Sequence, residues 1–133
     1  MDENTKKSQA AMVARAENVI KTAAVEFGHN LTNRVHELEQ AIINNNPENV
    51  IRMAYDLESE AAIFGWSRVT RISKWLTKIF TGEFDQKPKA EEISKALNAL
   101  KIMVSDPDNP DEDRDVELVR KLYPILSRVG AYF

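Results

Sequence analysis

The chain has 133 residues, a net charge of −3 and no cysteine, which suits one compact domain and excludes disulfide bonds, thiolate zinc sites and cysteine nucleophiles. The charge is too small and too evenly mixed for a nucleic-acid surface, and no apolar stretch reaches the roughly 18 residues of a membrane span. Because the polar N-terminal stretch also lacks the apolar core of a signal peptide, we expect a soluble, cytoplasmic protein without a cofactor.

Apolar residues recur with the period of an α-helix in each segment, and none alternates with the period of a strand. We predict a first helix from Thr5 to Phe27, ended by Gly28 as a C-terminal cap. A second helix begins near Asn30 and presents one apolar face formed by Leu31, Val35, Leu38 and Ile42. Asn44, Asn45 and Asn46 end it, and Asn46-Pro47 has the residue types of an N-cap followed by the first helical position.

The second half of the chain has the same organisation. A third helix from Pro47 to Phe64 buries Val50, Ala54, Leu57, Ala61 and Phe64. Ser67 is the expected cap of a fourth helix, whose inward residues are Val69, Ile72, Leu76 and Ile79. After a turn at 82–88, a fifth helix presents Ile93, Leu97, Leu100 and Val104. An acidic loop at 105–115 precedes a last helix that carries Val116, Val119, Tyr123 and Leu126 and is interrupted or restarted at Pro124.

Short connections between helices favour antiparallel packing of neighbours. The sequence therefore predicts an all-α protein, with residues 1–133 forming one domain. Its architecture is an antiparallel four-helix bundle with an additional N-terminal helix and a C-terminal helical extension over 105–133.

The third predicted helix carries a family resemblance. In the stretch from Ala54 to Gly65, the residues Ala54, Leu57, Ala61, Phe64 and Gly65 stand in the register of a recurring helical motif, Ala-His-x-Leu-Lys-Gly-x-Ala-x-x-Phe/Leu-Gly. This stretch resembles the centre of a histidine-phosphotransfer (HPt) domain, and the likeness extends over a core of about 30–104. The resemblance implies a bundle that exchanges phosphate with receiver domains of two-component signalling pathways.

The departures from the family pattern all lie at the positions that would take part in phosphate transfer. Tyr55 stands in place of the phosphate-accepting histidine, Glu58 in place of a lysine and Ser59 in place of a glycine. A tyrosine cannot form the phosphoramidate that makes phosphohistidine a reversible carrier, and a glutamate repels a phosphoryl group. The resemblance therefore indicates a degenerate member that does not transfer phosphate at this site.

The position of Tyr55 predicts a docking role. At about 100° per residue, Tyr55 lies roughly 130° from the buried stripe of its helix, at the solvent boundary. The expected docking face for a receiver domain or sensor kinase is formed by Ile51, Tyr55, Glu58, Ser59 and Ala62. On the next helix, Trp75 lies among Arg68, Arg71 and Lys78 and is expected to pack in the core beside these cationic neighbours. If that helix is exposed instead, Arg71 and Trp75 form a second docking surface for an acidic partner. The alternative is that Tyr55 only packs against the adjoining helix.

Two other functions remain open. Helix-borne acid and amide pairs that share a face could align water in a receiver phosphatase, and the candidates here are Glu37 with Gln40 and Asp56 with Glu60. A structural bundle that dimerises through an apolar face is the third hypothesis, because the sequence leaves the oligomeric state undetermined. His29 and His36 are weak candidates for a replacement phosphate acceptor. The acidic loop lacks the glycine of a calcium-binding loop.

Overall fold

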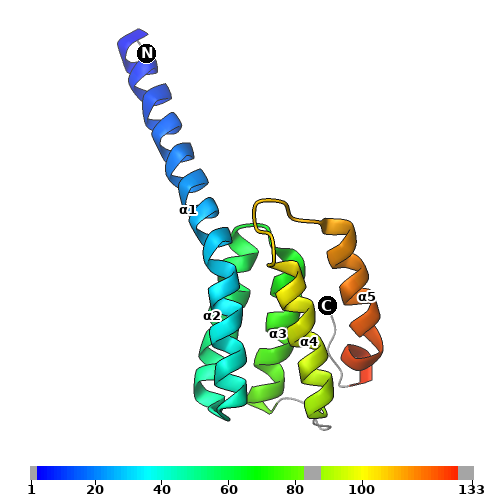
Figure 1. Cartoon of the computed structure of the whole chain (residues 1–133). Coiled ribbons are helices and arrows are strands. Elements are labelled where there is room, and N and C mark those ends of the chain that lie inside the picture. Colours follow the sequence, from blue (N-terminus) through cyan, green and yellow to red (C-terminus); the bar gives the residue numbers. More distant parts are fainter. Residues whose placement is uncertain (1–2, 83–87, 129–133) are drawn as a thin grey trace.

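The computed structural model describes residues 3–82 and 88–128 and places them in five helices, with no strand in these ranges. The helices are α1 (Glu3–Ile43), α2 (Pro47–Ile63), α3 (Ser67–Thr81), α4 (Ala90–Met103) and α5 (Glu112–Arg128). Successive helices run in opposite directions, and the N-terminal part of α1 projects beyond the others (Figure 1). Within the described ranges, no helix has the length and apolar character needed to cross a membrane. The all-helical prediction is confirmed.

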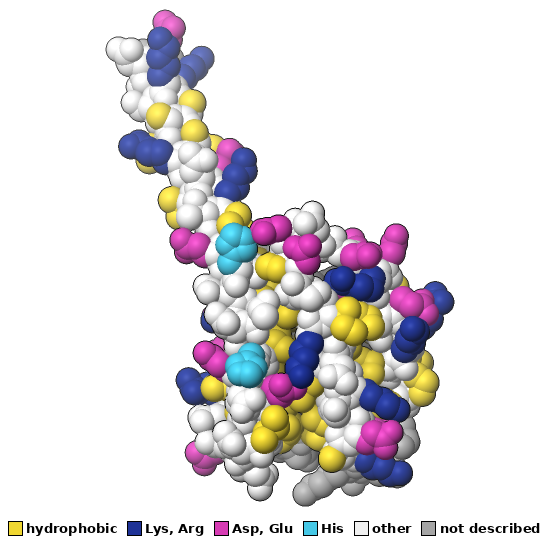
Figure 2. Space-filling model, viewed as in Figure 1, with side chains coloured by type: hydrophobic (Ala, Val, Ile, Leu, Met, Phe, Trp, Pro, Cys, Tyr) yellow, Lys and Arg dark blue, Asp and Glu magenta, His cyan; other side chains and the backbone are white. Residues whose placement is uncertain are grey.

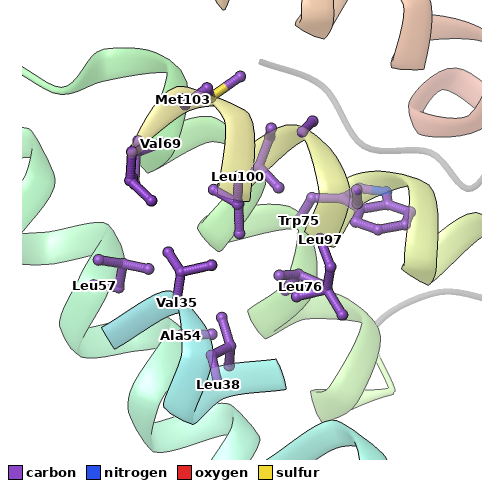
Figure 3. Packing of buried hydrophobic residues seen from close by; sticks show 14 of the residues in the cluster. Val35, Leu38, Ala54, Leu57, Val69, Trp75, Leu76, Leu97, Leu100 and Met103 are labelled. Carbon is purple, nitrogen blue, oxygen red and sulfur yellow. The ribbon is translucent and has the colours of Figure 1, made fainter. Parts of the chain in front are cut away.

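The helices pack as a bundle around one apolar core. α1 contacts α2 and α4, α3 contacts α2 and α4, and α5 packs against α3 and α4. Each helix contributes one face of buried apolar residues to the core. Figure 3 shows part of this core and labels Val35, Leu38, Ala54, Leu57, Val69, Trp75, Leu76, Leu97, Leu100 and Met103. Most residues predicted to face inward are buried, while Ile42, Phe64, Ile79 and Ile93 are only partly buried at its margin.

The predicted break at Gly28 is wrong, and so is the separate N-terminal helix. Gly28 lies inside α1, which continues from Glu3 to Ile43 without interruption. Phe27 and Leu31 are both buried, so tertiary packing holds the helix on either side of the glycine. The Phe27 ring stacks on Phe64 with centroids 4.9 Å apart. A glycine ends a helix when it takes a positive φ, as Gly65 and Gly82 do in this structure.

Replacing Gly28 by alanine is therefore expected to stabilise the protein. Glycine within a helix costs about 0.5–1 kcal/mol relative to alanine because it loses more backbone freedom on folding. An added Cβ would meet Pro107 at 3.7 Å and Trp66 at 3.8 Å, which are ordinary van der Waals contacts. We expect Gly28→Ala to raise the free energy of unfolding in urea by about that amount. A loss of stability would indicate that the helix ends at this residue.

The cap predicted for α2 is confirmed and the cap predicted for α3 is wrong. The Asn46 side chain accepts a hydrogen bond from the Asn49 backbone N–H at 3.3 Å, and Pro47 begins α2. In α3 the N-cap position belongs to Trp66, and Ser67 is already the first helical residue. The Ser67 hydroxyl accepts a bond from the Arg68 guanidinium at 2.8 Å. A serine beside a helix start predicts the start only to within a residue.

The last helix begins earlier than predicted, at Glu112 within the predicted acidic loop, and it differs in two further ways. α5 runs through Pro124 without a restart, although proline removes one backbone hydrogen bond within a helix. Leu122 and Leu126 are buried on either side of Pro124, so packing on α3 and α4 maintains the helix there. Tyr123 was expected to face inward and is instead 62% exposed. Gly130 lies outside the described residues, as does most of the turn predicted at 82–88.

Candidate functional site

The outward face of α2 presents Tyr55. Its side chain is 58% exposed, whereas its neighbour Ala54 is fully buried in the core. Ser59 and Ala62, one and two turns further along the helix, are also exposed, and Ile51 is partly buried beside them. The structure therefore places Tyr55 on the surface, and packing of its ring into the bundle is excluded for this conformation.

Ser59 is fixed to the helix that carries Tyr55. Its hydroxyl donates a hydrogen bond to the Tyr55 carbonyl oxygen at 3.0 Å, a bond from one helical turn to the previous one. A serine hydroxyl held against its own backbone is short and does not cover the neighbouring phenol ring. The exposed ring of Tyr55 offers apolar area and a hydroxyl, which suits contact with another protein.

Glu58 forms the edge of this face toward α3. The Glu58 carbonyl accepts a hydrogen bond from the Thr70 hydroxyl at 3.4 Å, which brings the two helices together at this point. Partial burial raises the pKa of the Glu58 carboxyl above its ordinary value, and the positive charges of Lys74 and Lys78 on α3 partly offset this effect. The edge of the face therefore contains one carboxyl and two ammonium groups.

The raised pKa of Glu58 gives a testable pH dependence. Burial disfavours the carboxylate form of Glu58 in the folded protein. Glu58 therefore contributes to stability at pH values below its pKa in the unfolded chain, and this contribution is lost as the pH rises through its pKa in the folded protein. We expect Glu58→Gln to be more stable than the unchanged protein at pH 7, by less than about 1 kcal/mol because solvent screens the group. The difference should vanish at low pH.

Urea unfolding at several pH values from neutral to about pH 4 checks this expectation. Lys74→Gln serves as the companion variant, because removing that positive charge should raise the Glu58 pKa further and steepen the pH dependence. If Glu58→Gln were less stable at pH 7, attraction by the lysines would outweigh the effect of burial.

Arg71 and Trp75 do not form the second docking surface predicted from the sequence. Trp75 is 1% exposed, because its indole packs in the core with residues of α4 such as Leu97 (Figure 3). Arg71 is partly buried and lines a groove between α3 and α5 together with Val119 and Tyr123. A docking role for Trp75 is thus excluded in this conformation, since a partner could not reach the side chain.

The residues proposed for a phosphatase lie on α1 and α2. Glu37 and Asp56 line a depression of about 210 Å³ between α1 and α2, together with Arg34 and Arg52. Glu60 forms an ion pair with Arg34 at 2.5 Å and so joins the two helices. Gln40 is exposed further along α1. Glu37 and Gln40 are therefore both exposed and one turn apart on α1, as predicted, whereas an ion pair with Arg34 already engages Glu60.

Both histidines lie on α1, whereas Tyr55 lies on α2. His29 is exposed on α1, and its Nε2 lies 2.8 Å from Asp108 Oδ1, which ties the acidic loop to this helix. His36 is exposed on α1. Among the described residues, no group of three or more His, Asp or Glu side chains is placed to hold a metal ion.

Comparison of the chain with protein-family models, curated proteins and solved structures gives no match. The case for a function therefore rests on the residues and their geometry.

Proposed function

We propose that this protein binds a receiver domain or sensor kinase of a two-component pathway through the face around Tyr55, and does not pass phosphate. The observation that carries this proposal is the exposed tyrosine at the position where the HPt pattern has its histidine. The face consists of Ile51, Tyr55, Glu58, Ser59 and Ala62, and we call it the Tyr55 face.

The arrangement of helices supports the proposal. The C-terminal part of α1 and the helices α2, α3 and α4 contact one another in a closed order, which is compatible with the antiparallel four-helix bundle of the HPt family. In such a bundle the reacting residue projects outward from one helix, and Tyr55 projects outward from α2. Fold likeness alone is weak support for a function, so the chemistry of the face decides how the protein would act.

That chemistry favours binding over transfer. A phenol is a weak nucleophile at neutral pH and does not form the labile N–P bond that a phosphorelay needs. Tyrosine does provide apolar area and a hydroxyl with few rotatable bonds, which makes it frequent among residues that dominate binding energy. We infer a competitor or adaptor that occupies the surface of a receiver where a true phosphotransfer domain would dock.

The positive charges beside the Tyr55 face favour an acidic partner surface. The positive charges of Lys74 and Lys78 partly offset the rise in the Glu58 pKa that burial causes. Both ammonium groups therefore lie near Glu58 and border the Tyr55 face on the α3 side. Receiver domains, as the family resemblance implies, present an acidic phosphorylation pocket, which these lysines would attract. Binding is therefore expected to weaken with added salt.

The test uses a receiver from the same cell, phosphorylated with labelled phosphate and mixed with the full-length protein. The docking proposal predicts a complex in which the label stays on the receiver at its usual rate of loss. Faster loss of label without labelling of this protein would favour the phosphatase hypothesis. In that case Gln40→Ala or Glu60→Ala should abolish the acceleration, although the ion pair of Glu60 with Arg34 speaks against such a role.

A further inference from the structure

The first part of α1 projects from the bundle into solvent. Its side chains are exposed from Glu3 to Thr22, and Phe27 is the first buried residue of the helix. We call residues 3–26 the N-terminal arm; at 1.5 Å per residue it is roughly 36 Å long. Figures 1 and 2 show it standing clear of the other helices, with hydrophobic side chains at its surface.

These hydrophobic side chains follow one face. They recur at spacings of three and four residues, and this arm stripe is formed by Met12, Val13, Ala16, Val19, Ile20 and Ala23. The stripe continues directly into Phe27 and Leu31, which lie in the bundle core. Val13 is 57% exposed and Ile20 is 64% exposed. A stripe that is covered in the bundle and bare in the arm indicates that something covers the arm.

We propose that the arm stripe pairs with the same stripe of a second copy of this chain, with the two helices antiparallel. An antiparallel register exists in which Met12 lies opposite Ala23 of the second copy and Ala16 lies opposite its Val19. In both of these layers a large side chain faces a small one, which lets two helices interlock, while Val13 and Ile20 flank the layers along one edge. A parallel pair in register would instead set Ala16 against Ala16 and Val19 against Val19, leaving a gap beside a crowded layer.

The same register keeps the two bundles apart. Residue 8 of the second copy lies level with Phe27, the point at which the bundle begins, so the bundles stand at opposite ends of the paired arms. The contact is isologous and closes on two copies, as most soluble homodimers do. Residues 3–7 of each copy lie level with residues 28–32 of the other, beside the near end of its bundle, and contribute no layer to the paired stripe.

Charge on the arm favours a second copy over a lipid surface. Residues 3–26 contain four basic and three acidic side chains, which is nearly balanced. Helices that lie on anionic membranes carry an excess of lysine and arginine on the polar face. The six stripe residues are uncharged, so the central layers of the pair bury no charge.

Sedimentation of the full-length protein over a range of concentrations tests the pairing. We expect a concentration-dependent rise to twice the 15.1 kDa of the chain. Val13→Lys with Ile20→Lys should weaken association at least about a hundredfold, because each copy would bring two charges of one sign to the edge of the paired stripe in place of apolar side chains. Val25→Lys is the matched control, since Val25 is 56% exposed on the opposite side of the arm. A monomer at every concentration, or equal loss in both variants, would overturn the proposal.

Cysteine substitution tests the orientation, because the chain has no cysteine of its own. Met12→Cys combined with Ala23→Cys should give a disulfide-linked dimer on mild oxidation. Met12→Cys alone should not cross-link, since the two copies of residue 12 lie far apart in the antiparallel pair. Cross-linking by the single variant would contradict that orientation. Binding of a monomer to phosphatidylserine vesicles, lost in the Val13→Lys/Ile20→Lys variant, would replace the second copy by a lipid surface.

Discussion

Replacing Trp75 by alanine is expected to lower the free energy of unfolding by about 3–5 kcal/mol. The side chain is 1% exposed and belongs to the core that α3 and α4 share, so alanine would leave a large cavity between them. A loss of this size is a large part of the 5–15 kcal/mol that typically separates folded from unfolded domains. Chemical denaturation followed by circular dichroism measures it.

Trp75→Phe separates the packing of the ring from its N–H group. Among the described residues, the buried Trp75 Nε1 has no hydrogen-bond partner, and an unpaired buried donor costs about 1–3 kcal/mol. Phenylalanine keeps most of the ring and removes that donor, so we expect a cost of less than about 1 kcal/mol. If Trp75→Ala left stability unchanged, the residue would be exposed in solution, and the docking role predicted from the sequence would be open again.

Tyr55→Ala is expected to weaken binding of a receiver domain by about tenfold to a hundredfold. Tyr55 provides the largest exposed side chain of the Tyr55 face, and its removal takes away both apolar area and the hydroxyl. Stability should change little, because the ring is mostly in solvent and alanine favours a helix. Titration calorimetry with the purified receiver measures the affinity.

Tyr123→Ala is the control for this prediction. Tyr123 is as exposed as Tyr55, and it lies on α5, which contacts α3 and α4 but not the Tyr55 face of α2. Its removal should leave receiver affinity within about twofold. Equal losses in both variants would mean that exposed tyrosines contribute non-specifically, and that the face has been placed wrongly.

Local patterns predicted α2 well. Its start depends on neighbouring residues alone: Asn46 caps the helix and Pro47 fits its first position, and both are found there. Its buried stripe follows from helical period, which places Ala54 inside and Tyr55 outside. The period placed Tyr55 at the solvent boundary, but it left open whether the ring packs against the adjoining helix, because that depends on the neighbouring helix.

Features that depend on contacts between distant segments could not be predicted in this way. Gly28 has the residue type of a helix end, and only the burial of Phe27 and Leu31 shows that the helix continues. The spacing left open whether Trp75 packs in the core or forms a docking surface, and its burial in the core shared with α4 decides this. The proximity of Glu58 to Lys74 depends on how α2 and α3 pack, which no spacing along the chain reveals.

The most direct test of the account restores the three residues that depart from the phosphotransfer pattern. The unchanged protein and the variant Tyr55→His/Glu58→Lys/Ser59→Gly are each incubated with a receiver carrying labelled phosphate, and label on each protein is followed. We expect the unchanged protein to bind the receiver and stay unlabelled, and the triple variant to accept phosphate. Label on the unchanged protein, or a folded triple variant that neither binds nor accepts phosphate, would contradict it.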